Sequence, residues 1–204
     1  MPKTQEIIEG LQAITAGNTL LAVIWHVAIY GLIVALILGW TPSNKLSALV
    51  ICIPVVSVAV LAWTHGNPFN GSLFVILAIV LFIFSLKASS QPITYSQLTF
   101  LIIGIMMVAF AVVYPHFLET SSITKYLYAS PVGLIPCPTL SLIIGFALIL
   151  NCFSSNAITL TLIIFGLFYG IFGVLKLAVY LDIGLIVGTL TLLAKYIIGL
   201  KQIA

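Results

Sequence analysis

The residues whose side chains could carry out chemistry are few, and most lie in three of the segments that join long apolar stretches. These residues are His65, Asn67, Asn70, His116, Glu119, Lys176 and Asp182. The three segments alternate along the chain, so in a membrane protein they would emerge on the same side. Polar and ionisable groups close to a membrane are costly and tend to line a cavity or to pair with one another. We therefore expect any site to lie on this face; the alternative is that His65 and His116 are solvated loop residues.

The most unusual stretch of the sequence holds two prolines, Pro136 and Pro138. Each proline lacks a backbone N–H donor and disfavours the helical conformation of the residue before it. We expect a helix to begin at Pro138, which suits a first turn, and to run to Phe153. The 15 residues after the proline would extend only about 22 Å, less than the hydrocarbon thickness. Val132–Ile135 would then enter the membrane in a non-helical form.

Irregular backbone at membrane depth is tolerated only where protein surrounds it or where it lines a water-filled cavity. The N–H groups of this segment and of the first helical turn would face that cavity. Discontinuous helices of this kind bind substrates or ions in secondary transporters. The candidate pore or ligand residues are therefore Pro136, Cys137, Pro138 and Thr139. The alternative is a proline-rich helix cap lying shallowly under the preceding loop.

A further candidate is His26 in the first apolar stretch, about 9 Å deep by helical rise. A His at this depth faces the bundle interior, either as a hydrogen-bonded group or as a ligand. His26 and Cys137, with Met106 or Met107 nearby, could form a soft-metal site, although Met in an apolar helix is mostly packing material. The three cysteines have no ligand or disulfide spacing. We predict no cofactor, only contacts with lipid.

The composition indicates the class of protein. Of the 204 residues, 62% are hydrophobic and only 5% are charged, with seven Lys and no Arg against four acidic residues, for a net charge of +3. A soluble domain carries about 25% charged residues because water must solvate its surface. This composition excludes a soluble enzyme and a disordered tail, and the lack of a basic cluster excludes a nucleic-acid-binding protein. The chain is predicted to be an integral membrane protein.

Seven apolar segments approach or meet the length of about 20 residues that a spanning helix needs. They are Leu20–Trp40, Leu46–Trp63, Ser72–Leu86, Leu98–Tyr114, Pro131–Phe153, Ala157–Leu175 and Ile183–Leu200. We predict an all-α bundle of seven transmembrane helices in residues 18–204, with the fifth helix broken by proline. Residues 1–17 are predicted to form an amphipathic helix that lies on the membrane surface or packs on neighbouring loops.

The lysines set the predicted orientation. With seven crossings, Lys3, Lys125 and Lys176 fall on the N-terminal side and the other four lysines on the opposite side. Because basic residues favour the cytoplasmic side, we predict an outside N-terminus and a cytoplasmic C-terminus.

Glycines four residues apart predict how the last two helices pack. Helix six holds Gly166, Gly170 and Gly173, and helix seven holds Gly184 and Gly188. This spacing gives a flat groove that lets helices approach closely. We expect helices six and seven to pack against one another, with a lipid-facing homodimer contact as the alternative.

Other residues near the ends of the spans have simpler predicted roles. Interfacial anchors are predicted at Trp40, Trp63, Tyr169 and Tyr180. Lys195 is expected to extend its ammonium towards water. Asp182 is expected to be the N-cap of the last helix, with a proton relay as the alternative.

The segment Gly133-Leu-Ile-Pro-Cys-Pro-Thr139, with Tyr114-Pro115-His116 before it and Leu181-Asp182-Ile-Gly184 after it, resembles an uncharacterised family of bacterial multi-pass membrane proteins. Pro-Cys-Pro-Thr is the most specific part of the resemblance, which covers all seven helices. The second loop keeps the family's Asn67-Pro68 but departs from its aromatic stretch. The resemblance implies a multi-pass protein of the bacterial inner membrane, and it implies no reaction or ligand.

Three functions are compatible with these residues. The first is a permease- or channel-like protein with an outward-facing polar vestibule at the broken helix, residues 136–139. The second is a non-catalytic accessory or structural subunit of a larger membrane complex, and the third is a metal- or haem-binding redox protein. Hydrolytic catalysis is the weakest hypothesis, because the sequence has no intramembrane carboxylate pair, nucleophile elbow or HExxH motif.

Overall fold

The computed structural model describes residues 4–151 and 155–201, and every regular element in these ranges is an α-helix or a 3-10 helix. They are α1 (Thr4–Gly17), α2 (Thr19–Ile37), α3 (Asn44–Val50), α4 (Cys52–Thr64), α5 (Pro68–Leu86), α6 (Leu98–Val113), η1 (Ile123–Lys125), α7 (Tyr126–Ala129), α8 (Pro136–Ile149), α9 (Asn156–Leu177), η2 (Tyr180–Asp182) and α10 (Ile183–Lys201). The all-α prediction is confirmed for the described residues.

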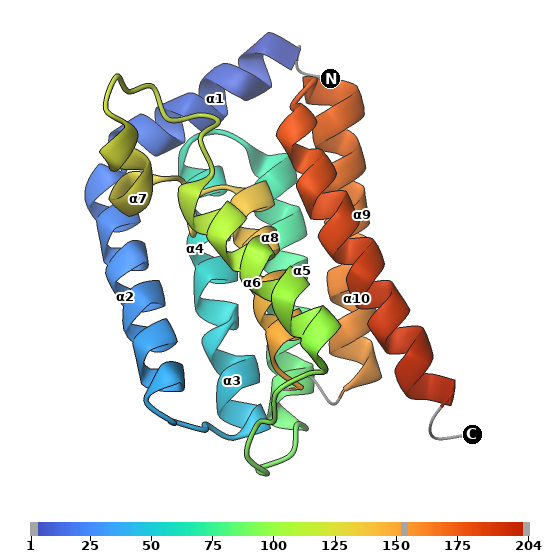
Figure 1. Ribbon diagram of the computed structural model, residues 1–204. Coiled ribbons are helices and arrows are strands. Elements are labelled where there is room, and N and C mark those ends of the chain that lie inside the picture. The colour runs from blue at the N-terminus through green and yellow to red at the C-terminus, as the bar shows by residue number, and fades with distance from the viewer. Residues whose placement is uncertain (1–3, 152–154, 202–204) are drawn as a thin grey trace.

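Helix α8 is the centre of the bundle (Figure 1). All 14 of its residues are buried, and it packs against α6, α9, α10 and α4. Its sequence is apolar on every side, which is typical of a helix surrounded by other helices. Helix α1 lies across one end of the bundle, above the N-terminal end of α8 (Figure 1).

Five helical segments are long and apolar enough to cross a membrane. They are Thr19–Ile37, Asn44–Thr64, Pro68–Leu86, Asn156–Leu177 and Tyr180–Lys201. Helices α6 and α8 are also apolar but contain only 16 and 14 residues, which is below the usual range for a span. Helical segments therefore occur at all seven predicted positions, and five of them have the length of a membrane span.

The second predicted span is divided into two helices. Helix α3 ends at Val50 and α4 begins at Cys52. Pro54 has no N–H to donate to the carbonyl group of Val50, which lies four residues earlier, so the helical hydrogen bonding is interrupted here. Ile51 between the two helices keeps near-helical dihedral angles, with φ −67° and ψ −19°.

The proline-rich segment breaks where the sequence predicts, but α8 has different ends. It begins at Pro136, two residues before the predicted start, because the first turn of a helix can hold both prolines without losing an intrahelical hydrogen bond. Ile135 before it is extended, with φ −129° and ψ 161°. The helix ends at Ile149, whereas the predicted end, Phe153, lies outside the described residues.

Three backbone N–H groups before α8, those of Gly133, Leu134 and Ile135, bond to nearby protein oxygens and do not face a cavity, so the prediction is wrong for these groups. The N–H of Gly133 donates to Thr139 Oγ1 at 2.9 Å. The N–H groups of Leu134 and Ile135 donate to the carbonyl of Pro131 at 3.1 and 3.2 Å. The irregular backbone is therefore satisfied internally and surrounded by protein, as buried polar groups require.

Gly133 is needed in this segment for two reasons. Its φ of +77° lies in the left-handed region that favours glycine, and a Cβ there would lie 2.5 Å from the ring of Trp25. Ser57 Oγ donates to the Gly133 carbonyl at 2.7 Å and accepts from Trp25 Nε1 at 3.2 Å. Helices α2 and α4 thus hold the segment in place.

The glycines of α9 pack against the region they were expected to contact. A Cβ on Gly166, Gly170 or Gly173 would overlap Thr189, Ile186 or Asp182, respectively. The residues contacted lie in η2 and α10, so α9 and α10 approach closely along this line.

The glycines of α10 contact a different helix from the one expected. Gly184 faces Phe110 and Gly188 faces Met107, and both of these neighbours belong to α6. A closer contact was not predicted: a Cβ on Gly104 of α6 would lie 2.7 Å from the carbonyl oxygen of Gly145 in α8.

Candidate functional site

A cavity of about 540 Å³ opens at the end of the bundle that α1 covers. Six parts of the chain surround it: α1, the α4–α5 turn with the start of α5, the α6–α7 connection at Phe117, Ile135 with the first turn of α8, the C-terminal half of α9, and η2. The predicted site residues that line it are His65, Asn67, Asn70, Pro136, Cys137, Lys176 and Asp182. The structure thus brings together predicted site residues from two of the three connecting segments and from the start of α8.

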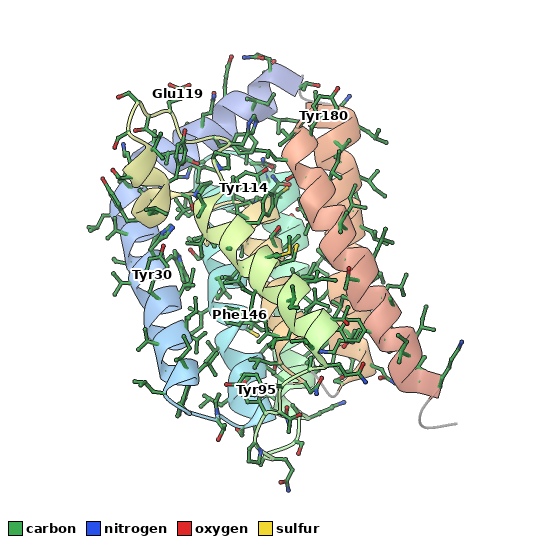
Figure 2. The ribbon with its side chains drawn as sticks, viewed as in Figure 1. Tyr30, Tyr95, Tyr114, Glu119, Phe146 and Tyr180 are labelled. Atoms are coloured by element: carbon green, nitrogen blue, oxygen red, sulfur yellow. The ribbon has the colours of Figure 1, made fainter. Side chains whose placement is uncertain are left out.

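Five predicted site residues lie outside the cavity lining. They are His26, His116, Glu119, Pro138 and Thr139. Glu119 is exposed near α1 (Figure 2), where Gln12 Nε2 donates to it at 3.2 Å. Thr139 Oγ1 accepts from Gly133 and donates to the Ile135 carbonyl at 2.7 Å, so its hydroxyl holds the start of α8.

The two predicted histidines outside the cavity, His26 and His116, make contacts elsewhere in the protein. His26 is 1% exposed; its Nδ1 lies 2.7 Å from the Ala22 carbonyl, and its Nε2 lies 3.1 Å from that of Val112 and 3.2 Å from Ser130 Oγ. The Nδ1 contact therefore lies within α2, and the Nε2 contact links α2 to α6. His116 packs edge-on against Phe117, and partial burial lowers its pKa, which favours the neutral imidazole.

The cavity does not bring together the soft-metal candidates His26 and Cys137. Cys137 lines the cavity, whereas His26 lies outside it. Within residues 4–151 and 155–201, no group of three or more His, Cys, Asp or Glu side chains is placed to hold a metal ion.

Asp182 is the most distinctive residue of the cavity. Its side chain is 1% exposed, and its Oδ1 accepts a hydrogen bond from Tyr114 Oη at 2.7 Å. Its Oδ2 accepts no hydrogen bond from an N–H or O–H group of any described residue, and the weak S–H donor of Cys137 lies beside the carboxylate. This oxygen lies against Gly173, where a Cβ would overlap it. The carboxylate is therefore turned into the protein to face Tyr114 and Gly173, a placement that its predicted N-cap role does not explain.

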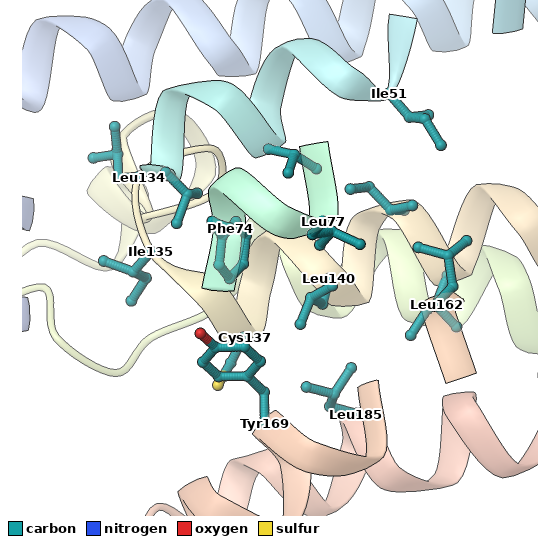
Figure 3. Close-up of a cluster of buried hydrophobic side chains, with 14 of the residues drawn as sticks. Ile51, Phe74, Leu77, Leu134, Ile135, Cys137, Leu140, Leu162, Tyr169 and Leu185 are labelled. Carbon is teal, nitrogen blue, oxygen red and sulfur yellow. The ribbon is translucent and has the colours of Figure 1, made fainter. Parts of the chain in front are cut away.

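The buried wall of the cavity joins α8 to α9. Cys137, in the first turn of α8, lies beside Asp182, and Figure 3 shows it next to the ring of Tyr169. Tyr169 is 3% exposed and donates from its hydroxyl to Asn70 Oδ1 at 3.1 Å. It is therefore a buried wall residue, and the prediction that it is an interfacial anchor is wrong.

The charged side chains around the cavity differ in how deeply they are buried. Glu6 of α1 and Lys176 of α9 are exposed at its rim, whereas Asp182 is buried. The first turn of α8 contributes a partial positive charge. Because Pro136 and Pro138 lack N–H groups, this turn offers few amide donors to a ligand.

The opposite end of α8 is closed by Lys195 of α10. Its Nζ donates to Ser96 Oγ at 2.6 Å, to the Ala147 carbonyl at 2.7 Å and to the Leu150 carbonyl at 3.2 Å. The prediction that this ammonium extends to water is wrong; it caps the C-terminal carbonyls of α8.

The α5–α6 connection completes this closed end. The N–H of Ser96 donates to the Ile149 carbonyl at 2.9 Å, and the N–H of Asn151 donates to the Thr94 carbonyl at 2.7 Å. Tyr95, between them in sequence, marks the end of the molecule far from α1 (Figure 2). A hollow of about 40 Å³ near this end is lined mostly by apolar residues.

Tyr114, Tyr169, Gly173 and Lys195 acquire their roles only from the tertiary contacts described above. In the sequence, each resembles an ordinary residue at the end or inside of an apolar helix. One pattern could have helped: Gly173 and Asp182 flank a short connection, where a small residue can make room for a polar one.

No family model matches this chain, and no curated protein or solved structure matches it. The resemblance to a bacterial multi-pass family therefore remains a prediction, and only the geometry of the cavity bears on function.

Proposed function

We propose that this protein is a permease-like membrane protein that binds a small solute in the cavity beneath α1. One observation carries the proposal: the cavity contains a buried carboxylate, Asp182, whose Oδ2 has no hydrogen-bond partner among the described residues. A buried charge without a full set of partners is costly. A bound solute that supplies the missing partner would remove this cost.

The difference between the two ends of α8 supports a carrier rather than an open channel. The cavity opens at the α1 end, while Lys195 and the segment around Ser96 close the other end. A carrier exposes its site to one side of the membrane at a time, often at a discontinuous helix. Helix α8 is short and begins inside the protein, as such a helix does.

The membrane arrangement belongs to the same proposal. All seven predicted segments cross the membrane, and the short helices α6 and α8 do so because protein replaces lipid around their ends. The protein lies in the bacterial inner membrane with the α1 end outside. Helix α1 packs Leu11 and Ile14 onto the bundle, while its Gly10 lines the cavity, so α1 forms the outer cover of the solute site.

Gly10 offers a direct way to test the cavity. A Cβ on Gly10 would meet no atom within 4 Å, so Gly10→Phe fills the cavity without a steric clash at the backbone. Gly31 of α2 is exposed and outside the cavity, and its Cβ position is equally open. Gly31→Phe is therefore a matched control.

The experiment measures efflux of a panel of small solutes from proteoliposomes by mass spectrometry. We expect at least one solute to leave vesicles containing the wild-type protein faster than it leaves protein-free vesicles. Gly10→Phe should abolish that flux, and Gly31→Phe should leave it within about twofold. A flux that Gly10→Phe does not change would overturn the proposed site.

Thiol labelling distinguishes a failed permease from a closed cavity. With Cys52 and Cys152 replaced by Ala, a membrane-impermeant methanethiosulfonate should label Cys137 in wild type and label it more slowly in Gly10→Phe. Labelling without flux of any solute would reject the permease and favour the accessory-subunit hypothesis, in which a partner occupies the cavity.

A further inference from the structure

We infer that the solute is an organic monocation whose ammonium group binds the Oδ2 atom of Asp182. This substrate class rests on the proposed function. Within the cavity, Asp182 is the buried charged side chain, and Tyr114 supplies the hydrogen bond to its other oxygen. An ammonium group has three N–H donors and a positive charge. It would therefore supply both a hydrogen bond and a counter-charge to Oδ2.

The position of Oδ2 is fixed by the packing around it. Gly173 leaves room for this oxygen, because any Cβ there would overlap it. The thiol of Cys137 lies within reach of the Asp182 carboxylate as a hydrogen-bond donor, but a thiol is only a weak donor. The packing therefore fixes the position of the Asp182 carboxylate, and no strong donor neutralises its charge at Oδ2. A carboxylate in this state can pair with a positively charged ligand.

The rest of the wall accommodates the apolar part of such a ligand. Phe69, Phe117 and Phe172 line the cavity together with Tyr169. Aromatic faces attract ammonium groups by a cation–π interaction, and they also bury an apolar substituent. The volume of about 540 Å³ lies in the range of small-molecule sites and admits an ammonium that carries one aromatic ring.

The same residues disfavour anions and hard metal ions. An anion would approach the Asp182 carboxylate, and the first turn of α8 lacks two of its amide donors because of Pro136 and Pro138. Calcium and magnesium prefer about six oxygen ligands, whereas one buried carboxylate lines this cavity. Lys176 is exposed at the rim, where water screens its charge.

Three probe molecules of similar shape separate the effect of ligand charge on binding from the effect of ligand size. They are 2-phenylethylammonium, 2-phenylethanol and phenylacetate, measured by isothermal titration against the full chain in detergent. We expect the ammonium to bind at least about tenfold more tightly than the alcohol, and phenylacetate to bind more weakly than either. Gly10→Phe should prevent binding of all three, because it fills their common site.

Asp182→Asn is the matched variant, because the amide oxygen can still accept from Tyr114 while the charge is removed. It should weaken binding of the ammonium at least about tenfold and leave binding of the alcohol within about twofold. Glu119→Gln removes an exposed charge outside the cavity and should change neither. Tryptophan fluorescence during heating checks that the variants remain folded.

The possible failures are distinguishable. Tighter binding of phenylacetate, or equal binding of the three probes, overturns the monocation class but keeps the cavity as the site if Gly10→Phe still abolishes binding. Binding that survives Gly10→Phe overturns the cavity itself, and with it the proposed function.

Discussion

The two ends of α8 receive side chains of opposite charge from the same part of the chain. Asp182 in η2 lies at the N-terminal end, and Lys195 in α10 lies at the C-terminal end. Each sign is the one that the helix dipole favours at that end. The two residues lie 13 positions apart in the chain, a separation of about 20 Å along a helix, close to the length of about 21 Å of the 14-residue α8.

The two charges differ in how completely they are satisfied. The Lys195 ammonium has three oxygen acceptors at 2.6 to 3.2 Å. Asp182 Oδ1 accepts from the Tyr114 hydroxyl, and its buried Oδ2, packed against Gly173, has no hydrogen-bond partner among the described residues. The proposed function therefore assigns stability to the closed end and ligand binding to the open end. Variants at the two ends should therefore separate stability from binding.

The largest expected effect on stability is that of Lys195→Met. The variant keeps the apolar stem but leaves the carbonyls of Ala147 and Leu150 without their ammonium partner. We expect the free energy of unfolding to fall by about 3 kcal/mol, measured by SDS titration in mixed micelles. Lys201→Met, which changes an exposed lysine of the same helix, should change it little. Equal effects of the two substitutions would contradict the idea that Lys195 locks this end.

Gly173→Ala should have the next largest effect, because its Cβ would overlap the Asp182 carboxylate. We expect a loss of about 2 kcal/mol from overpacking. Gly10→Ala, at an open position of α1, should be neutral or slightly stabilising. A double-mutant cycle with Asp182→Ala checks the cause: the loss should shrink when the carboxylate is absent, and an unchanged loss would mean that Gly173 serves another contact.

Thr139→Val tests the irregular segment that leads into the open end. It removes the hydroxyl that accepts from the N–H of Gly133 and leaves that buried donor unpaired. We expect a loss of about 1 kcal/mol. Thr139→Ser keeps the hydroxyl and should recover most of the stability; if it is as unstable as the Val variant, the methyl group rather than the hydrogen bond matters.

The smallest expected effect on stability is that of Asp182→Asn. The amide oxygen still accepts from Tyr114, and the uncharged group is easier to bury. We expect the free energy of unfolding to change by less than about 0.5 kcal/mol, in contrast to Lys195→Met. A large loss would show that Asp182 stabilises the fold, and the distinction between the two ends would then fail.

Most of the helical architecture could be predicted from the sequence, because long apolar segments separated by polar turns leave few alternatives. The break before α8 was also predictable, since Pro136 and Pro138 restrict the backbone locally. The sequence did not indicate which acceptors the non-helical N–H groups before α8 would bond to. It depends on Pro131 and on the hydroxyl of Thr139, which lie within hydrogen-bonding distance only after the segment folds back.

The candidate site was predicted in part. His65, Asn67, Cys137, Lys176 and Asp182 line one cavity, but their grouping was expected only as a shared face. The sequence offered no way to rank Asp182 above the others. Its importance comes from Tyr114 and Gly173, which are 68 and 9 residues away in the chain.

The sequence by itself determined that the chain is helical, strongly apolar and interrupted before Pro136, because composition and proline geometry act locally. Only the tertiary structure decided that α8 is enclosed on all sides, that Lys195 turns inward, and that Asp182 keeps an oxygen without a hydrogen-bond partner among the described residues. Those outcomes depend on which helices, distant in the sequence, pack together. Because the helix surfaces are uniformly apolar, no local sequence pattern indicates the packing partner of each helix.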